Sequence, residues 1–312
     1  MIVRIPGLAG RKWRKNDPLL IFGICFLVLL LLFAIFGPMV RDAQLKPPGA
    51  TNFSSVYDPV VDEATGRSLK PFQPPFGKAT LGSDEIGRDV MARLAQGARI
   101  SLVVGFVVQI LALLVGVTVG VLGVYAPKWL AGPLMRLTDA MFAFPDILLA
   151  ILIVSVVRTD MFDNTFLGPI GKMLPVIVAL SFTAWPSIAR LVRSQVASLK
   201  DREFVVAAKA NGASTFYLAT RHVLPQLMGI LMAVSMIEVA GTILAESTLS
   251  FLGIGIQAPD PSWGSMINAA RQNMTSHPIV LLWPCLLLSL TIFALNFVGD
   301  GLRALLDPKN SR

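Results

Sequence analysis

Six long apolar stretches set the limits on what this chain can fold into. Each is close to the roughly 20 helical residues that cross the ~30 Å hydrocarbon core of a bilayer. With 54% hydrophobic and 15% charged residues, the chain is also more apolar than an ordinary soluble domain. The sequence therefore predicts an all-α, polytopic membrane protein with six transmembrane helices. The expected spans are residues 19–40, 100–125, 137–157, 174–189, 227–251 and 279–299.

The distribution of charge predicts the orientation of these spans. With the N-terminus inside, the inward segments hold 16 Lys and Arg against 5 Asp and Glu, whereas the outward segments hold 11 against 10. Basic residues are enriched in cytoplasmic loops, so we expect a multi-pass protein of a prokaryotic cytoplasmic membrane with both termini inside. The first span, longer than a signal-peptide core, is expected to be an uncleaved anchor. The inward segments are residues 1–18, 126–136, 190–226 and 300–312, and the outward segments are residues 41–99, 158–173 and 252–278.

The outward loop 41–99 divides into two parts. Residues 41–80 are rich in Pro, Asp and Gly, which predicts irregular, partly mobile structure. Residues 83–99 are predicted to form an amphipathic helix at the membrane surface, with Ser83 as its N-cap.

The inward loop 200–226 carries the signals of a helix–turn–helix outside the bilayer. Asp201 is expected to cap a first short helix, and Asn211-Gly212 supplies the left-handed residue that ends it. Ser214 is expected to cap a second short helix, which Pro225 follows. The loop is longer than most helix–helix connections. From the residues alone it is either a docking element for another protein or an inert loop.

A family resemblance favours the docking element. The inward loop reads Glu203-x-x-x-Ala207-Ala208-x-x-x-Gly212 with Leu224-Pro225 downstream, and it resembles the EAA loop of ABC-importer permeases. Nearly the whole chain resembles the C-type permeases of the dipeptide, oligopeptide and nickel group. Other matching strings include Leu81-Gly82-Ser83-Asp84-Glu85-Ile86-Gly87-Arg88-Asp89, Phe144-Pro145, Glu246-Ser247-Thr248-Leu249-Ser250-Phe251-Leu252-Gly253-Ile254-Gly255, Pro261-Ser262-Trp263-Gly264 and Gly299-Asp300-Gly301-Leu302-Arg303.

The resemblance implies a type I ABC importer permease fold. It implies a first helix at 19–40, a core permease domain of five transmembrane helices at 100–299, and a coupling helix within 200–226 that seats on a cytoplasmic ATPase. Lys209 and Asn211 depart from the usual loop pattern, and the outer loop 41–80 is longer than in many members. The residues expected to dock on the ATPase are Glu203, Ala207, Ala208, Gly212, Ala213, Ser214, Leu224 and Pro225.

The partners implied are a homologous second permease, two ABC ATPase subunits, an extracytoplasmic substrate-binding protein and membrane lipid. The cargo implied is di- or oligopeptide, with nickel chelates or oligosaccharides as the alternative within the same transporter type. A different class, an ATPase-independent secondary transporter or channel, would not need the docking loop.

The chain contains no Gly-x-x-x-x-Gly-Lys-Ser/Thr phosphate loop. The energy source is therefore expected on a partner, with ATP and magnesium bound there and no cofactor in this chain. We expect a non-catalytic subunit without nucleic acid as partner. A metal site is not expected either, because His222 and His277 are predicted on opposite sides of the membrane.

Acidic residues inside predicted spans are candidates for the transport pathway, because an ionised acid in a bilayer is costly unless it is paired or hydrated. Each has a structural alternative, a bond to a neighbouring helix. Asp139 is expected to pair with a basic residue, and Arg190 and Arg193 to anchor the inner end of a span. The pathway or gating candidates are Asp146, Glu238, Glu246 and Ser250.

Overall fold

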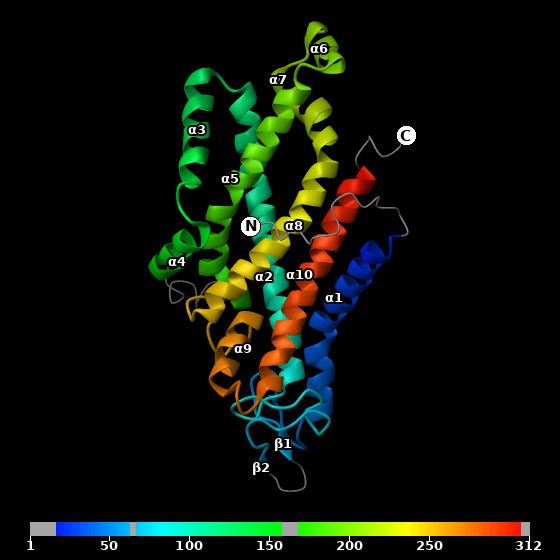
Figure 1. Cartoon of the computed structure of the whole chain (residues 1–312), viewed down its shortest axis with the longest axis vertical. Coiled ribbons are helices and arrows are strands. Elements are labelled where there is room, and N and C mark those ends of the chain that lie inside the picture. Colours follow the sequence, from blue (N-terminus) through cyan, green and yellow to red (C-terminus); the bar gives the residue numbers. More distant parts are fainter. Residues whose placement is uncertain (1–16, 63–66, 158–167, 307–312) are drawn as a thin grey trace.

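The computed structural model describes residues 17–62, 67–157 and 168–306. Five of its helices are long and apolar enough to cross a membrane, and they form one elongated bundle (Figure 1). This confirms the predicted polytopic all-α fold. The five helices are α1 (Pro18–Leu45), α2 (Val90–Tyr125), α5 (Leu174–Leu199), α8 (Leu224–Phe251) and α10 (Pro278–Leu306).

The span expected at 137–157 is not a single helix. The structure has α3 (Lys128–Met141) and α4 (Asp146–Val156) there, bent by 95° at the break between them. Pro145 is the N-cap of α4. A proline cannot donate a backbone hydrogen bond and disfavours helical geometry at the residue before it, so Phe144-Pro145 interrupts the helix. Counting the bent pair as one span gives the sixth crossing.

Helix α2 lies at the centre of the bundle and packs against α1, α5 and α8. Two glycines let α5 approach it closely. A Cβ at Gly116 would lie 2.6 Å from the Cβ of Ile188, and one at Gly120 would lie 2.7 Å from the Cβ of Val192. Small residues at such crossings are what membrane helices use to bring backbones together.

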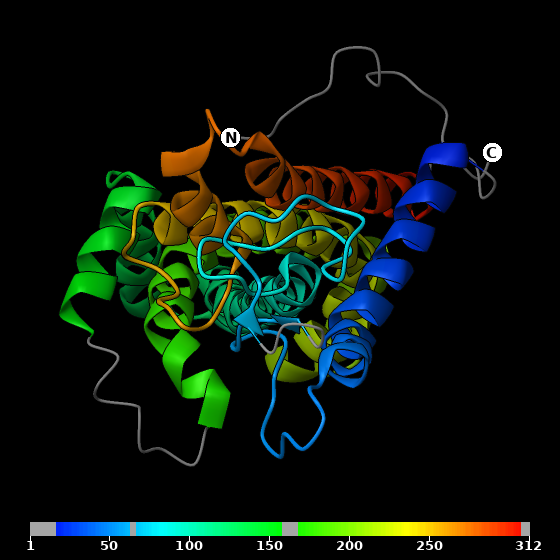
Figure 2. The same ribbon diagram turned by 90° about the horizontal axis from the view of Figure 1, so that it is seen from below.

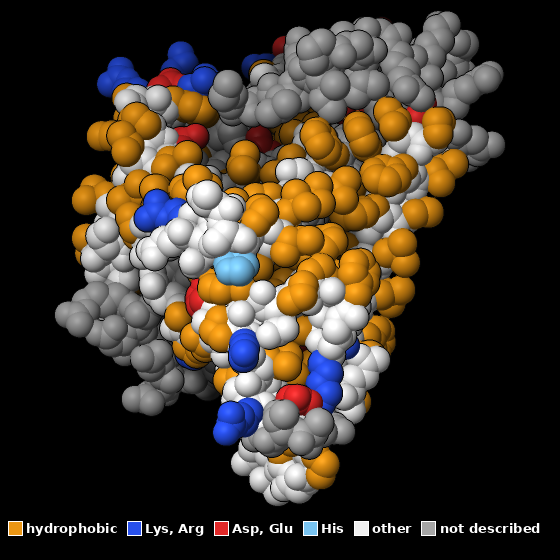
Figure 3. Space-filling model, turned by 60° about the horizontal axis from the view of Figure 1, so that its bottom comes forward, with side chains coloured by type: hydrophobic (Ala, Val, Ile, Leu, Met, Phe, Trp, Pro, Cys, Tyr) orange, Lys and Arg blue, Asp and Glu red, His pale blue; other side chains and the backbone are white. Residues whose placement is uncertain are grey.

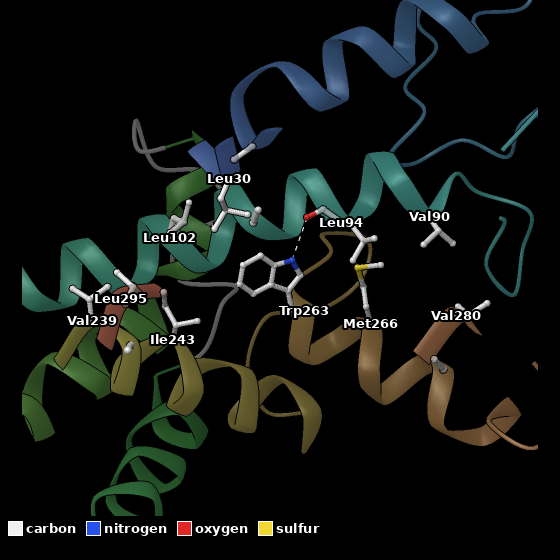
Figure 4. Packing of buried hydrophobic residues seen from close by; sticks show 14 residues of the cluster. Leu30, Val90, Leu94, Leu102, Val239, Ile243, Trp263, Met266, Val280 and Leu295 are labelled. Carbon is white, nitrogen blue, oxygen red and sulfur yellow. Dashed lines mark hydrogen bonds between the residues drawn. The ribbon is translucent and has the colours of Figure 1, made fainter. Parts of the chain in front are cut away.

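The largest buried side chain joins a short helix to the bundle. Trp263 begins α9 (Trp263–Ala270), is fully buried, and donates its indole N–H to the carbonyl oxygen of Leu94 at 3.2 Å (Figure 4). Around it, residues of α1, α2, α8, α9 and α10 form one apolar cluster. The cluster includes Leu30, Leu94, Leu102, Val239, Ile243, Met266 and Leu295.

The cap, defined as the described residues of 46–89, covers one end of the bundle and lies across the helix ends (Figure 2). Its described residues up to 80 are mostly irregular, as predicted, whereas residues 41–45, expected in the same loop, extend α1. Its only strands within the described residues are the antiparallel pair β1 (Val61–Asp62) and β2 (Arg67–Ser68). Yet Val56, Val60 and Ser83 are buried, so the cap is packed as well as irregular.

The amphipathic helix predicted for 83–99 is wrong in its first half. Helix α2 begins only at Val90, and Asp89 rather than Ser83 caps it by accepting from the Ala92 N–H at 2.9 Å. The hydroxyl of Ser83 instead donates to the Lys70 carbonyl at 3.0 Å and accepts from the Gln73 N–H at 2.8 Å. Gly87, at φ +87°, holds a left-handed conformation that interrupts a helix at this point.

On the face drawn in Figure 3, hydrophobic side chains cover much of the middle, and most of the charged side chains lie toward the two ends. Exposed leucines, isoleucines and phenylalanines are frequent on α1 and α2. A protein with apolar side chains on its middle surface and polar ends is suited to a bilayer. Two 3-10 turns, η2 (Gly168–Met173) and η4 (Arg271–Asn273), precede α5 and α10.

Candidate functional site

The loop between α5 and α8 lies at the end of the bundle opposite the cap (Figure 1). It contains α6 (Glu203–Ala210) and α7 (Thr215–Tyr217). Asp201 does not cap α6 as predicted. Arg202 is the N-cap, without a side-chain cap bond, and its own N–H is bonded to the Leu199 carbonyl at 3.1 Å. Asp201 lies inside the turn that ends α5, one residue too early to reach the first N–H groups of α6.

The end of α6 is formed as predicted. Gly212 has φ +82°, and its N–H bonds to the Lys209 carbonyl at 3.0 Å. The N–H of Ala213 reaches back to the Ala208 carbonyl at 3.1 Å. These two bonds and the left-handed glycine form a Schellman motif, which satisfies carbonyls at the helix end. The turn between α6 and α7 is therefore set by Gly212.

The second short helix is not separate from the following span. Ser214 caps α7 as predicted, accepting from the Tyr217 N–H at 3.3 Å. The chain then continues through a π-helical turn, η3 (Leu218–Val223), directly into α8. Pro225 has no N–H to bond to the carbonyl four residues earlier, and the turn widens there, with the Leu224 N–H bonded to Ala219 O.

One side chain of α6 reaches the protein interior. Val205 is buried at 2% exposure, in a cluster with Val192 and Val196 of α5 and with Leu218 and Val223. Ala208 and Ala213 pack against the same cluster. The loop is thus attached to α5 and η3 by the apolar side chains of Val205, Ala208 and Ala213. Most residues of α6 are exposed.

The predicted docking residues are largely accessible. The exposed ones are Glu203, Ala207, Gly212, Ser214 and Pro225, and the half-buried ones are Ala208, Ala213 and Leu224. Sequence reasoning missed the large apolar side chains that stand among them. The sequence offered one usable signal. A helix as short as α6 can bury only one or two side chains, here Val205, so its other apolar side chains are expected to be exposed and available to a partner protein. The missed residues, with exposed fractions, are Phe204 (40%), Val206 (53%), Phe216 (79%) and Tyr217 (50%).

Glu246 lies in a closed polar cage within the bundle. Its side chain is fully buried and accepts from Ser101 of α2 at 2.9 Å and from Ser250 of α8 at 2.8 Å, with Ser247 at 3.4 Å. Ser250, 1% exposed, also accepts from the Ile256 N–H at 2.9 Å. This arrangement fits the structural alternative for Glu246, since a buried carboxylate needs such partners. Neither Glu246 nor Ser250 opens onto a surface.

Two other pathway candidates lie on neighbouring helices. Glu238 is half-buried in α8, and Asp146 is exposed in the first turn of α4, a helix that contacts α8. Asp146 lies at the start of α4, where the helix dipole favours a negative charge. The bend between α3 and α4 thus presents an acid beside α8.

Asp139 pairs with a basic residue, as predicted. Arg190 donates to Asp139 at 2.9 Å, with the two side chains 56% and 66% exposed, and its guanidinium lies 3.8 Å from the Phe142 ring centroid. These contacts join α3 to α5. Arg193 lies one turn farther along α5.

Asp260 holds three segments together at the cap end. The hydroxyl of Tyr57 donates to Asp260 at 2.7 Å, and Lys172 of η2 approaches its other oxygen at 3.2 Å. Burial, reinforced by the hydrogen bond to Asp260, raises the pKa of Tyr57 to about 12. The phenol is therefore a neutral donor at physiological pH.

The two histidines engage aromatic neighbours. His277 stacks on Phe72 with ring centroids 4.5 Å apart, and His222 lies edge-on to Tyr217 at 5.6 Å. Among the described residues, no three His, Cys, Asp or Glu side chains gather as a potential metal site.

Comparison with known proteins identifies this architecture. A family described as "Binding-protein-dependent transport system inner membrane component" matches residues 93–312. The chain is 36% identical to the dipeptide transport system permease protein DppC of Bacillus subtilis, covering 97% of this chain and 86% of that one. It is 34% identical to the oligopeptide transport system permease protein OppC of the same organism, covering 95% and 87%. The glutathione transport system permease protein GsiD of an Escherichia coli strain is 34% identical, covering 96% and 89%.

The fold also matches a solved transporter. A chain from the inward-facing MetNI methionine ABC transporter superposes with a TM-score of 0.56 at 20% identity, covering 69% of this chain and 97% of the other. At that identity the likeness concerns the fold.

Proposed function

Because this chain belongs to the inner-membrane components of binding-protein-dependent transport systems, we propose that it forms half of the translocation pathway of an ABC importer for di- or oligopeptides. The observation that carries the proposal is the loop from Glu203 to Tyr217. Val205 packs this loop against α5, Gly212 ends α6 within it, and Phe204, Val206 and Phe216 are exposed. Such a rigid apolar surface is what a partner protein would cover.

The partner at this loop is an ABC ATPase. The chain has no phosphate loop, so the energy for transport must enter through a docked protein, and this chain is a non-catalytic subunit. The excess of basic residues on the side of α6 supports a cytoplasmic location for that end and for both termini. The cap then faces the extracytoplasmic side, where the substrate-binding protein docks.

A second, homologous permease would complete the pathway. Helix α4 buries only Ala150, while Leu148, Leu152 and Val156 are each more than 60% exposed. Asp146 begins this lightly packed helix, and α8, which carries Glu238, contacts it. We propose that these two acids line the pathway between the permeases, where they would meet the cationic amino group of a peptide.

Peptides are favoured as cargo because the relatives compared above are named for dipeptide, oligopeptide and glutathione transport. Nickel chelates or oligosaccharides carried by the same machinery are the alternative. An ATPase-independent secondary transporter or channel is the rival class.

Reconstitution tests the proposal. The chain is placed in proteoliposomes with the second permease, the two ATPases and the binding protein, and uptake of a radiolabelled dipeptide is measured. We expect uptake only when ATP and every component are present. Dipeptide flux through the chain alone would identify a secondary transporter and overturn the proposal.

A further inference from the structure

Phe76 is the most exposed large apolar side chain of the cap. Its exposed fraction is 89%, and its backbone φ is +71°. A bulky residue in the left-handed region is unusual and costs free energy, and such strain is concentrated at sites of function. Single exposed apolar residues are common on proteins, but exposure and strain at the same residue call for an explanation.

The loop that carries Phe76 is rigid. Its ends are closed by a pair of hydrogen bonds between Gln73 and Ser83: the Gln73 N–H donates to the Ser83 hydroxyl at 2.8 Å, and the Ser83 N–H donates to the Gln73 carbonyl at 3.2 Å. Inside the loop, the Phe76 N–H bonds to the Thr80 carbonyl at 3.0 Å. Pro74-Pro75, directly before Phe76, further restrict the backbone.

The loop is also bonded to α1. Arg41 of α1 donates from Nη2 to the Lys78 carbonyl at 3.0 Å, and Ala79 is buried. Gly82, at φ +91°, has no room for a side chain, because a Cβ there would lie 2.6 Å from the Gln73 carbonyl oxygen. The loop therefore holds Phe76 outward in one position.

Phe72 shows what a similar backbone does when its ring serves packing. It too has a positive φ, of +56°, but its ring stacks on His277 at 4.5 Å and packs against the cluster around Trp263. The contacts of Phe72 account for its conformation. Phe76 has the same type of backbone and leaves its ring almost fully exposed.

We infer that Phe76 is an anchor on which the extracytoplasmic substrate-binding protein docks, its ring entering an apolar pocket of that protein. This inference rests on the proposed function, which makes the partner at the cap a binding protein. Aromatic side chains dominate the energetics of interfaces, and a preformed loop loses little conformational entropy on binding. An exposed aromatic held rigidly on the cap has both properties.

The test uses the complete transporter in nanodiscs and measures binding-protein-stimulated ATP hydrolysis. Phe76→Ala keeps the Cβ and its backbone strain but removes the ring. We expect it to raise the binding-protein concentration for half-maximal stimulation about tenfold or more. Basal ATP hydrolysis should stay unchanged, and Phe76→Tyr should restore near-wild-type stimulation. The matched control is Ile86→Ala, at a 51% exposed residue of the same cap, with less than about a twofold effect expected.

An unchanged half-maximal concentration in Phe76→Ala would overturn the inference, as would an equal loss in Ile86→Ala. If wild type is itself not stimulated by binding protein, the proposed function fails instead, so the two failures are distinguishable.

A fluorophore at Phe76→Cys, in a chain with Cys25→Ala and Cys285→Ala, separates protein docking from lipid contact. A blue shift on adding binding protein supports the inference. A shift already complete in lipid alone would assign the ring to the membrane surface and contradict it.

Discussion

Arg41 at the end of α1 and Asp89 at the start of α2 form a two-bonded ion pair, with Nε–Oδ2 at 2.9 Å and Nη2–Oδ1 at 3.0 Å. Both side chains are buried, at 6% and 0% exposure. Asp89 also caps α2, and Arg41 also holds the Phe76 loop through Lys78. One pair therefore joins two membrane helices to the cap.

Removing one partner of this pair should destabilise the protein strongly. Breaking a buried ion pair leaves an uncompensated charge and costs about 3–5 kcal/mol. We expect Arg41→Ala to lower the thermal unfolding midpoint of the purified transporter clearly. Arg190→Ala, which breaks the exposed pair with Asp139, should change it little because exposed pairs contribute roughly 0–1 kcal/mol. Equal midpoints for Arg41→Ala and wild type would contradict this view.

The backbone conformation at Gly212, rather than the space around it, should control coupling. A Cβ there meets nothing within 4 Å, but φ is +82°. A β-branched residue disfavours this region, whereas asparagine tolerates it. We therefore expect Gly212→Val to reduce the uptake per ATP hydrolysed and Gly212→Asn to stay near wild type. Equal losses in the two variants would show that steric contact, not conformation, decides.

Val205 should hold the docking loop in place. Replacing it by alanine creates a cavity where α6 meets α5, at a cost of about 1–3 kcal/mol. Val206, adjacent but 53% exposed, provides the control. Hydrogen exchange of residues 203–217 should speed up in Val205→Ala and remain unchanged in Val206→Ala. Unchanged exchange in both variants would mean that other contacts fasten the loop.

The two acids of α8 should respond differently to mutation. Glu246→Ala leaves the hydroxyls of Ser101 and Ser250 without their acceptor, and each unsatisfied buried group costs about 1–3 kcal/mol. It should lower the unfolding midpoint. Glu238→Gln should leave the midpoint nearly unchanged, because Glu238 is only half-buried. It should reduce dipeptide uptake, because the negative charge proposed to meet the peptide's amino group is lost. If Glu238→Gln instead lowered the unfolding midpoint and Glu246→Ala reduced only uptake, Glu238 would be the structural acid and Glu246 the pathway acid.

The membrane helices and the chemistry of the turns could be predicted from the sequence because both depend on local signals. Apolar length identified the spans, and Gly212 and Ser214 marked a helix end and a helix start. Long-range packing could not be read in this way. The cage around Glu246 requires Ser101, 145 residues away, and the position of the cap depends on Arg41 meeting Asp89 across 48 residues.

The errors have the same origin. Ser83 has the residue type of an N-cap, but its hydroxyl is used across the cap by Lys70 and Gln73, so the helix begins at Val90 instead. Asp201 lies one residue too early because the end of α5 extends into the loop. The exposed apolar residues of the docking loop were missed because the sequence gives the type of each residue but not which side chains are buried by packing against other helices.

Cross-linking from α6 tests the central claim most directly. A photo-reactive amino acid replaces Val206, exposed on α6, and in a second protein replaces Ile86, exposed on the cap at the opposite end. Both are illuminated in the complete transporter. The account predicts that residue 206 yields a covalent adduct with the ABC ATPase and that residue 86 does not. An ATPase adduct from residue 86, with none from residue 206, would contradict it.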